Sequence, residues 1–302
     1  MKKKQLRWTL WTIASPFILF IILCILIYLP PIQNFLVDKA AVYASEATGM
    51  NISVGRISLS FPLNLVVTDV DAASPHNDTL LSVRRLQVNV QLLPLLKKQV
   101  EVDGISLQGA TVNSNDLIHG MKLNGTLGEL FISSHGVALD PETAIVNKVL
   151  LKDTDLSLCL NDTAAVDTAA SDTTYWKIIL QDIDLQNVSF ALDMPLDSLS
   201  LAASLDNAIL RDGLIDLHKS AYSLQTFRIK NGRVRYDSGK PLAADSLPSG
   251  LDPSHIALTD IGVKLDSLYY EGRNMKAIIS QFVLKERSGV EIVSATGRMV
   301  SN

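Results

Sequence analysis

The segment Ile183-Asp-Leu185-Gln-Asn187-Val-Ser-Phe190 shows the pattern from which the fold of this 302-residue chain is predicted. Apolar residues stand at its first, third, sixth and eighth positions, and this alternation is typical of a β-strand with one apolar face. Asn187 stands at the fifth position and shifts the alternation by one residue. A β-bulge or a very tight turn shifts the phase in this way.

The same unit recurs along the chain, each time with Gly, Asp or Asn at its fifth position. A weak first copy and five clear copies begin at Leu65, Ile105, Val149, Ile183, Phe227 and Ile256. Their starts are separated by 40, 44, 34, 44 and 29 residues. The unequal spacing excludes a strict solenoid, but the recurrence favours repeated β-units stacked along one axis.

Two further runs alternate between apolar and polar residues. Residues 57–65 are interpreted as one strand, which Pro62 places at a sheet edge or a bulge because proline lacks an N–H donor. Residues 86–92 predict another strand. Three stretches, residues 72–79, 161–174 and 237–255, interrupt the array as loops or insertions, and none has the composition of a domain boundary.

The N-terminus predicts a membrane anchor. Residues 9–29 carry no charge and are long enough, as a helix, to cross a bilayer of roughly 30 Å. Four bases precede this span, so the positive-inside rule places residues 1–8 in the cytoplasm and the rest of the chain across the membrane. The rival interpretation is a cleaved signal peptide, but no small-x-small cleavage site follows the apolar stretch.

An amphipathic helix is expected over residues 30–49. Apolar residues recur there at helical spacing, and Gly49 follows as a stop signal. Residues 50–302 then form one elongated β-rich module, so the fold class expected is mainly β, with a long, curved, antiparallel sheet behind two N-terminal helices.

Composition argues against several classes of function. The chain is 47% hydrophobic and 19% charged, which excludes disorder. Beyond residue 30 it holds 23 bases against 31 acids, so no nucleic-acid partner is expected.

No catalytic or metal site is expected either. No two of the five histidines lie within ten residues of one another, and no nucleotide-binding, zinc-protease or serine-hydrolase motif is present. The carboxylate pairs Asp153/Asp155 and Asp182/Asp184 alternate along strands, where solvated side chains explain them better than acid–base chemistry. We therefore expect a protein that is not an enzyme and that has no metal and no cofactor.

The physical property left to explain is an unbroken aliphatic face with few aromatics or helices to cover it. A curved sheet can leave that face as a trough for acyl chains, whereas a closed β-sandwich would bury it in a dry core. The residues expected to line a lipid groove are Ile57, Leu59, Phe61, Leu63, Leu65, Leu86, Val88, Val90, Leu92, Ile105, Leu107, Val112, Leu156 and Phe190.

The order of these features resembles a known family. The anchor and the helix ending in Ala-Thr-Gly49 are followed by Val54-Gly-Arg-Ile57-Ser-Leu59, Leu65-Val-Val-Thr-Asp-Val70 and Pro94-Leu-Leu-Lys-Lys-Gln-Val-Glu-Val-Asp-Gly-Ile-Ser-Leu107. This succession is similar to the start of AsmA-like bacterial envelope proteins, and the later units look most like the TamB branch. The resemblance covers residues 8–115 well and the remainder only as strand repeats.

The resemblance implies an inner-membrane protein whose periplasmic β-groove carries phospholipid toward the outer membrane. It also implies an outer-membrane barrel partner in a translocation and assembly module. The sequence stops inside a strand pattern, so we expect an N-terminal fragment or a short member of the family. The alternative is an anchored scaffold ectodomain that binds a protein or glycan without moving lipid.

Overall fold

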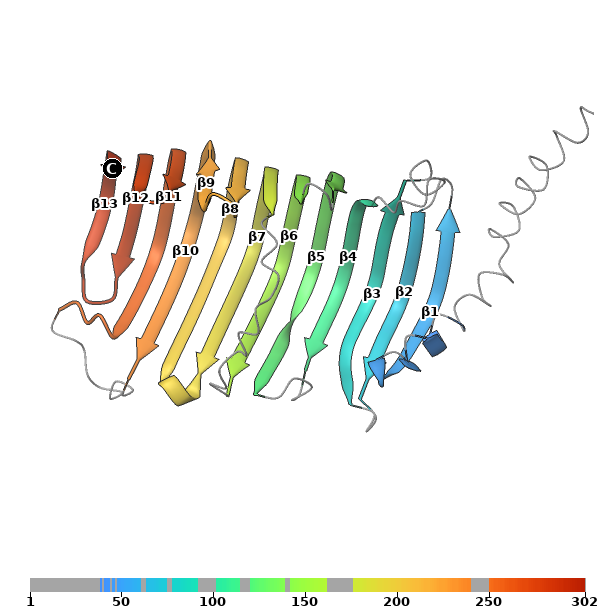
Figure 1. Cartoon of the computed structure of the whole chain (residues 1–302). Coiled ribbons are helices and arrows are strands. Elements are labelled where there is room, and N and C mark those ends of the chain that lie inside the picture. The colour runs from blue at the N-terminus through green and yellow to red at the C-terminus, as the bar shows by residue number, and fades with distance from the viewer. Residues whose placement is uncertain are drawn as a thin grey trace, which may run out of the picture.

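The described strands of the chain form one long sheet (Figure 1). The computed structural model describes residues 39, 41–43, 45–46, 48–60, 64–74, 78–91, 102–114, 120–138, 142–161, 176–239 and 250–301. Its strands are β1 (Asn51–Ser60), β2 (Asn64–Ala73), β3 (Thr79–Val90), β4 (Val102–Asn113), β5 (Met121–Ala138), β6 (Thr143–Leu160), β7 (Lys177–Met194), β8 (Leu199–Asp216), β9 (Ala221–Leu224), β10 (Thr226–Ser238), β11 (His255–Glu271), β12 (Asn274–Glu286) and β13 (Glu291–Ser301). A short 3-10 helix, η1 (Pro195–Asp197), joins β7 to β8.

The strands follow one another across the sheet almost in chain order. The path runs from β1 through β8, then β10 to β13, while the short β9 pairs with β8 and β11. The expected mainly-β fold with a long sheet is therefore confirmed, and the strands bend along their length (Figure 1). The described part contains no helix long and apolar enough to cross a membrane, and the predicted span at residues 9–29 lies outside it.

One pair of strands departs from the expected antiparallel order. β6 and β7 run parallel, with Thr143 opposite Lys177 and Cys159 opposite Asp193. Every other pair along the path is antiparallel. The local pattern of a strand does not record its direction relative to a neighbour, because both arrangements keep the same alternation of faces.

The prediction of one strand over residues 57–65 was wrong. The chain reverses between Ser60 and Asn64, and Leu59 lies opposite Leu65 across the resulting hairpin. A hairpin of this register keeps alternate residues on the same face before and after the turn, so it looks continuous in the sequence. Pro62 belongs to the segment between the two strands, which lies outside the described residues.

The fifth position of each repeated unit has a left-handed backbone. The φ angles are 53° at Asp69, 63° at Gly109, 49° at Asp153, 50° at Asn187, 53° at Asn231 and 52° at Asp260. Asn and Asp tolerate this region better than other non-glycine residues because their short polar side chains make local hydrogen bonds. The predicted phase shift is confirmed. Between β2 and β8 it occurs without a register shift beside it, so no extra residue is inserted there.

Strand β10 shows what the left-handed residue does to the two faces. Phe227 and Ile229 are half-buried before Asn231, and Gly232 and Val234 are more buried than their neighbours after it. A Cβ added to Gly232 would lie 3.1 Å from Cγ2 of Ile229, so these positions point to the same side. The phase shift at Asn231 thus keeps apolar residues on one face along the whole strand.

The end of the expected amphipathic helix lies partly within the described residues. Those described from 39 to 48 have helical conformation, and the N–H of Gly49 donates to the carbonyl of Ser45 at 2.9 Å. With φ of 69°, Gly49 closes the turn in the left-handed conformation that glycine adopts without strain. The stop at Gly49 is confirmed, while most of residues 30–49 lies outside the described part.

Candidate functional site

The apolar residues of successive strands line up in rows that cross the sheet. Register partners lie side by side on one face, so a row can be followed from strand to strand. One such row, here called the Leu156 row, consists of Ile52, Ala72, Leu81, Val112, Gly125, Leu156, Phe190, Ala203, Val234 and Leu258. It spans β1 to β11 with no polar side chain and ends where Leu258 meets Glu286 of β12.

Two more apolar rows lie beyond the left-handed residues, on the same face. The first holds Ile57, Val67, Leu86, Leu107, Leu130, Leu151, Leu185, Ala208, Ile229, Val263 and Phe282. The second holds Leu59, Leu65, Val88, Ile105, Ile132, Val149, Ile183, Leu210, Phe227, Leu265 and Ile279. We call the face that carries these rows the apolar face.

Ten of the residues predicted to line a groove fall on these three rows. Three of them lie on the Leu156 row, three on the row of Ile57 and four on the row of Leu59. Val90 is paired with Val102 just beyond a register shift. The remaining three, Phe61, Leu63 and Leu92, lie outside the described residues.

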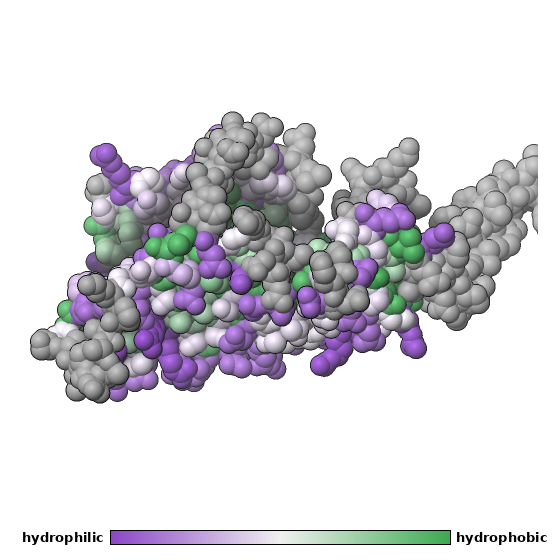
Figure 2. All heavy atoms as spheres, turned by 90° about the horizontal axis from the view of Figure 1, so that it is seen from below, coloured by the Kyte–Doolittle hydropathy of each residue, from purple (hydrophilic) through white to green (hydrophobic). Residues whose placement is uncertain are grey.

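Within the described part of the chain, no second layer of strands packs on the apolar face. All described strands belong to one sheet, and no large side chain among them is fully buried. Leu81, Ile105 and Phe190 remain 36–37% exposed. A closed sandwich of the kind considered above would bury such residues, and the described strands do not form one. In Figure 2 hydrophilic residues gather along the lower surface of the layer, and hydrophobic residues show above them.

The opposite face, here called the polar face, is held by cross-strand hydrogen bonds. Asn187 Nδ2 donates to Asp153 Oδ1 at 2.9 Å, and Asn231 Nδ2 donates to Asp206 Oδ2 at 2.8 Å. The Ser189 hydroxyl donates to Asp155, and Arg211 donates to Asp182. The Asp pairs noted in the sequence therefore serve as hydrogen-bond acceptors between neighbouring strands.

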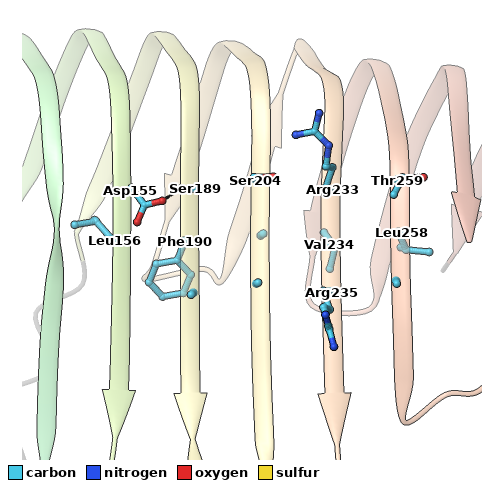
Figure 3. Close-up of a pocket in the computed structure, with 14 residues that line it drawn as sticks. Asp155, Leu156, Ser189, Phe190, Ser204, Arg233, Val234, Arg235, Leu258 and Thr259 are labelled. Atoms are coloured by element: carbon cyan, nitrogen blue, oxygen red, sulfur yellow. Dashed lines mark hydrogen bonds between the residues drawn. The ribbon is translucent and has the colours of Figure 1, made fainter. Parts of the chain in front are cut away.

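A hollow lined by described residues lies on the polar face of the sheet. It has a volume of about 410 Å³ and is lined by Asp155, Leu156, Ser189, Phe190, Ala191, Ala202, Ala203, Ser204, Arg233, Val234, Arg235, Ala257, Leu258 and Thr259 (Figure 3). These residues belong to the Leu156 row, from β6 to β11, and to the two rows adjacent to it. Side chains one residue away from an apolar row point to the other face, so the apolar row contributes the floor.

Sequence reasoning missed this hollow. The small side chains of Ala191 and Ala202 are adjacent in register, and together they leave space between Asp155 and the arginines of β10. Ala257 lies in the same row on the other side of Arg235. These alanines stand in different strands, so only the pairing of the strands reveals that Ala191 and Ala202 meet. In Figure 3 Arg233 and Arg235 extend away from each other along β10, on either side of Val234.

The end of the Leu156 row carries a charged group with satisfied hydrogen bonds. Glu286 is 7% exposed, and its carboxylate accepts hydrogen bonds from the N–H groups of Ala257 and Ser288. Hydrogen bonds from Ser288, and then from the backbone of Ala257, hold the pKa of this carboxyl below its ordinary value. An ionised carboxylate therefore closes the row at the β12–β13 turn.

The described residues bring no metal-binding group together, since no three His, Cys, Asp or Glu side chains converge there. Nδ1 of His255 lies 2.9 Å from Asp252, whose pKa is lowered mainly by that hydrogen bond. The two residues are three positions apart in a turn, and their contact fixes the start of β11. No protein-family model matches the chain, and no curated protein matches it significantly.

Proposed function

We propose that this protein binds lipid acyl chains on its apolar face and conducts them along the sheet. The observation that carries the proposal is the set of apolar rows that cross from β1 to β11 or β12 without a covering layer among the described residues. Exposed apolar patches beyond a few hundred Å² mark surfaces that bind other apolar groups. An acyl chain has no polar atoms to satisfy, so a row of aliphatic side chains suffices to hold it.

The direction of the rows suits movement of the ligand along the sheet. Each row runs across the strands, so a chain that slides along it exchanges one aliphatic contact for a similar one. Strands about 4.8 Å apart give the twelve-strand path a length of about 50 Å. Burial contributes about 25 cal/mol per Å² of apolar area at every position along the row. The movement needs no covalent step.

The cellular setting follows from the N-terminal sequence and from the resemblance described above. A single helix at residues 9–29 would anchor the protein in a bacterial inner membrane, with the sheet in the periplasm. The cargo would be phospholipid on its way to the outer membrane, and an outer-membrane barrel protein of an assembly module would be the partner. Membership of the AsmA-like family, in its TamB branch, is part of this proposal.

Native mass spectrometry of the full chain tests the proposal. The protein is purified in mild detergent, exchanged out of it, and examined for bound phospholipid. We expect stoichiometric lipid, lost in Leu107→Asp and in Val88→Asp, because each places a charge within an apolar row. Gln108→Asp and Gln87→Asp are the matched controls, since each adds an acid one residue away on the polar face.

A lipid-free wild-type protein that stays folded and monodisperse would contradict the proposal. Equal lipid loss in the apolar-face variants and their controls would also contradict it, because a general loss of structure would then explain the effect. Circular dichroism of all five proteins separates unfolding from loss of binding.

A further inference from the structure

Strand β10 carries a line of basic residues on the polar face. Arg228, Lys230, Arg233 and Arg235 are all exposed, whereas the residues between them, apart from Asn231, are more buried. We call these four residues the basic stripe. Their concentration on one strand is unusual in a chain that holds 31 acids and 27 bases.

The cations of the stripe are only partly neutralised by the protein. Arg235 pairs with Asp237 at 2.6 Å, and Arg233 lies 3.9 Å from Asp206. Arg228 and Lys230 make no ion pair with any described residue.

A second base on the next strand adds to this charge. Arg228 lies directly opposite Lys264 of β11, and like charges in that relation destabilise a sheet. Lys264 is itself 3.7 Å from Asp266. An anion placed over the stripe would relieve the repulsion that remains.

The hollow gives this anion a place to lie. Its floor over β8 carries the small side chains Ala202 and Ser204, and the stripe borders it through Arg233 and Arg235. Across β8, Asp155 borders the hollow and accepts a hydrogen bond from the Ser189 hydroxyl. Farther along β7, beyond the hollow, Asp184 accepts a hydrogen bond from the Gln186 amide at 3.3 Å. The groove is therefore basic along one side and acidic along the other.

The basic residues lie in a line along one strand, and this arrangement favours an extended anionic chain over a flat anionic surface. A flat anionic surface laid on the polar face would meet Asp155, Asp184 and Asp206 together with the bases. A single extended chain can follow the stripe with its own carboxylates turned toward the bases and away from Asp155 and Asp184. Alternate residues of an extended peptide repeat about every 6.7 Å, which is also the spacing of Arg228 from Lys230 and of Arg233 from Arg235.

We propose that the polar face over β8 is a docking groove for an extended segment of a partner protein with an acidic residue at every second position. The acids face the basic stripe in charge-assisted hydrogen bonds, and the residues between them face Asp155 and Asp184. Serine or threonine suits these intervening positions, because a hydroxyl donates to a carboxylate. The groove lies on the face opposite the apolar rows, so peptide binding can be tested independently of lipid binding.

Fluorescence polarisation with a labelled twelve-residue peptide of alternating Asp and Ser tests this groove on the full chain in uncharged detergent. We expect saturable binding at low salt that weakens as ionic strength rises. The double variant R233E/R235E should weaken binding at least tenfold. A peptide of the same composition, with its aspartates in one block and its serines in another, should bind less tightly because its charges do not match the spacing of the stripe.

The control variant is R56E/R85E, which makes the same change in charge within a row of the polar face far from β10. Its affinity should stay within twofold of wild type. Ala202→Trp adds a second, uncharged test, because it fills the exposed floor of the groove and should also weaken binding.

Three results would overturn the proposal. One is the absence of saturable binding by the alternating peptide. Another is equal loss in R56E/R85E, which would mean that only net charge matters. The third is binding of anionic phospholipid vesicles through Arg233 and Arg235 when the peptide does not bind, which would identify a membrane surface as the partner.

Discussion

Asn187 donates a hydrogen bond of 2.9 Å to the carboxylate of Asp153, and both residues have left-handed backbones, with φ of 50° and 49°. They are neighbours on the two parallel strands at the middle of the sheet. On the antiparallel strands to either side, a left-handed residue faces one with an ordinary backbone, such as Gly128 of β5 or Asp206 of β8. The parallel pair is where two such residues meet.

Replacing Asn187 tests the left-handed backbone directly. Asn187→Val should lower the free energy of unfolding by about 1–2 kcal/mol relative to Asn187→Gly, because a β-branched side chain clashes in this region whereas glycine does not. Both variants lose the hydrogen bond to Asp153, so the comparison isolates the backbone. Urea denaturation followed by circular dichroism measures the difference, and equal stabilities would mean that the backbone relaxes at this position.

Gly128 faces Asp153 from the other side, on β5. A Cβ there would lie 2.8 Å from the Cβ of Asp153 and 3.0 Å from its carbonyl oxygen. We expect Gly128→Ala to destabilise the protein by about 1–3 kcal/mol through this overlap. Gly297→Ala on β13 is the control, because nothing lies within 4 Å of its added Cβ. Thermal melts of the two variants should differ, and a Gly128 variant as stable as the control would contradict the close packing.

The exposure of the apolar face can be tested by comparing the free energies of unfolding of two variants. Phe190 is 37% exposed, so Phe190→Ala should cost well under the 3–5 kcal/mol typical of a buried phenylalanine. Leu80 is 4% exposed, and Leu80→Ala should cost about 2–5 kcal/mol although it removes a smaller side chain. Denaturant titration of both variants in lipid-free protein makes the comparison. A larger loss at Phe190 would mean that the apolar face is covered.

Glu286 makes stability depend on pH in a definite direction. Its pKa is lowered in the folded protein, so the ionised carboxylate adds stability above the ordinary pKa of a glutamate, near 4.5. That contribution is lost as the pH falls below this value and through the lower pKa of the folded state. Glu286→Gln should therefore flatten the stability profile between about pH 5 and pH 3. Glu129→Gln on β5 removes one carboxylate elsewhere and serves as the control, and identical profiles for the two variants would contradict the assignment.

The repeated unit was predictable because its cause is local. Whether a residue adopts a left-handed backbone depends on its own side chain, so Asp, Asn and Gly at the fifth position could be recognised without knowing any neighbour. The alternation of apolar and polar residues likewise follows from the geometry of a single strand. The ten groove residues on the three apolar rows were placed on one face for this reason, and the hairpin at residues 60–64 was missed because it preserves that alternation.

The unequal spacing of the units was visible in the sequence, but the pairing of strands explains it. Units whose starts are 40 or 44 residues apart lie two strands apart in the sheet, on strands that run in the same direction. The two units that start 34 residues apart lie on β6 and its parallel neighbour β7. The two that start 29 residues apart lie on β10 and the adjacent antiparallel strand β11. Strand direction is decided by hydrogen bonds between distant segments, and no residue within a strand encodes it.

The sequence by itself therefore determined the mainly-β fold, the positions of the left-handed residues and the division of each strand into an apolar and a polar face. Those properties come from the conformational preferences and solvation of individual residues. Tertiary structure alone decided that β6 and β7 are parallel, that the apolar rows join across the sheet, and that Ala191 and Ala202 meet beside the strand that carries Arg233 and Arg235. These depend on register, which matches residues far apart in the chain and is set only when whole strands pair.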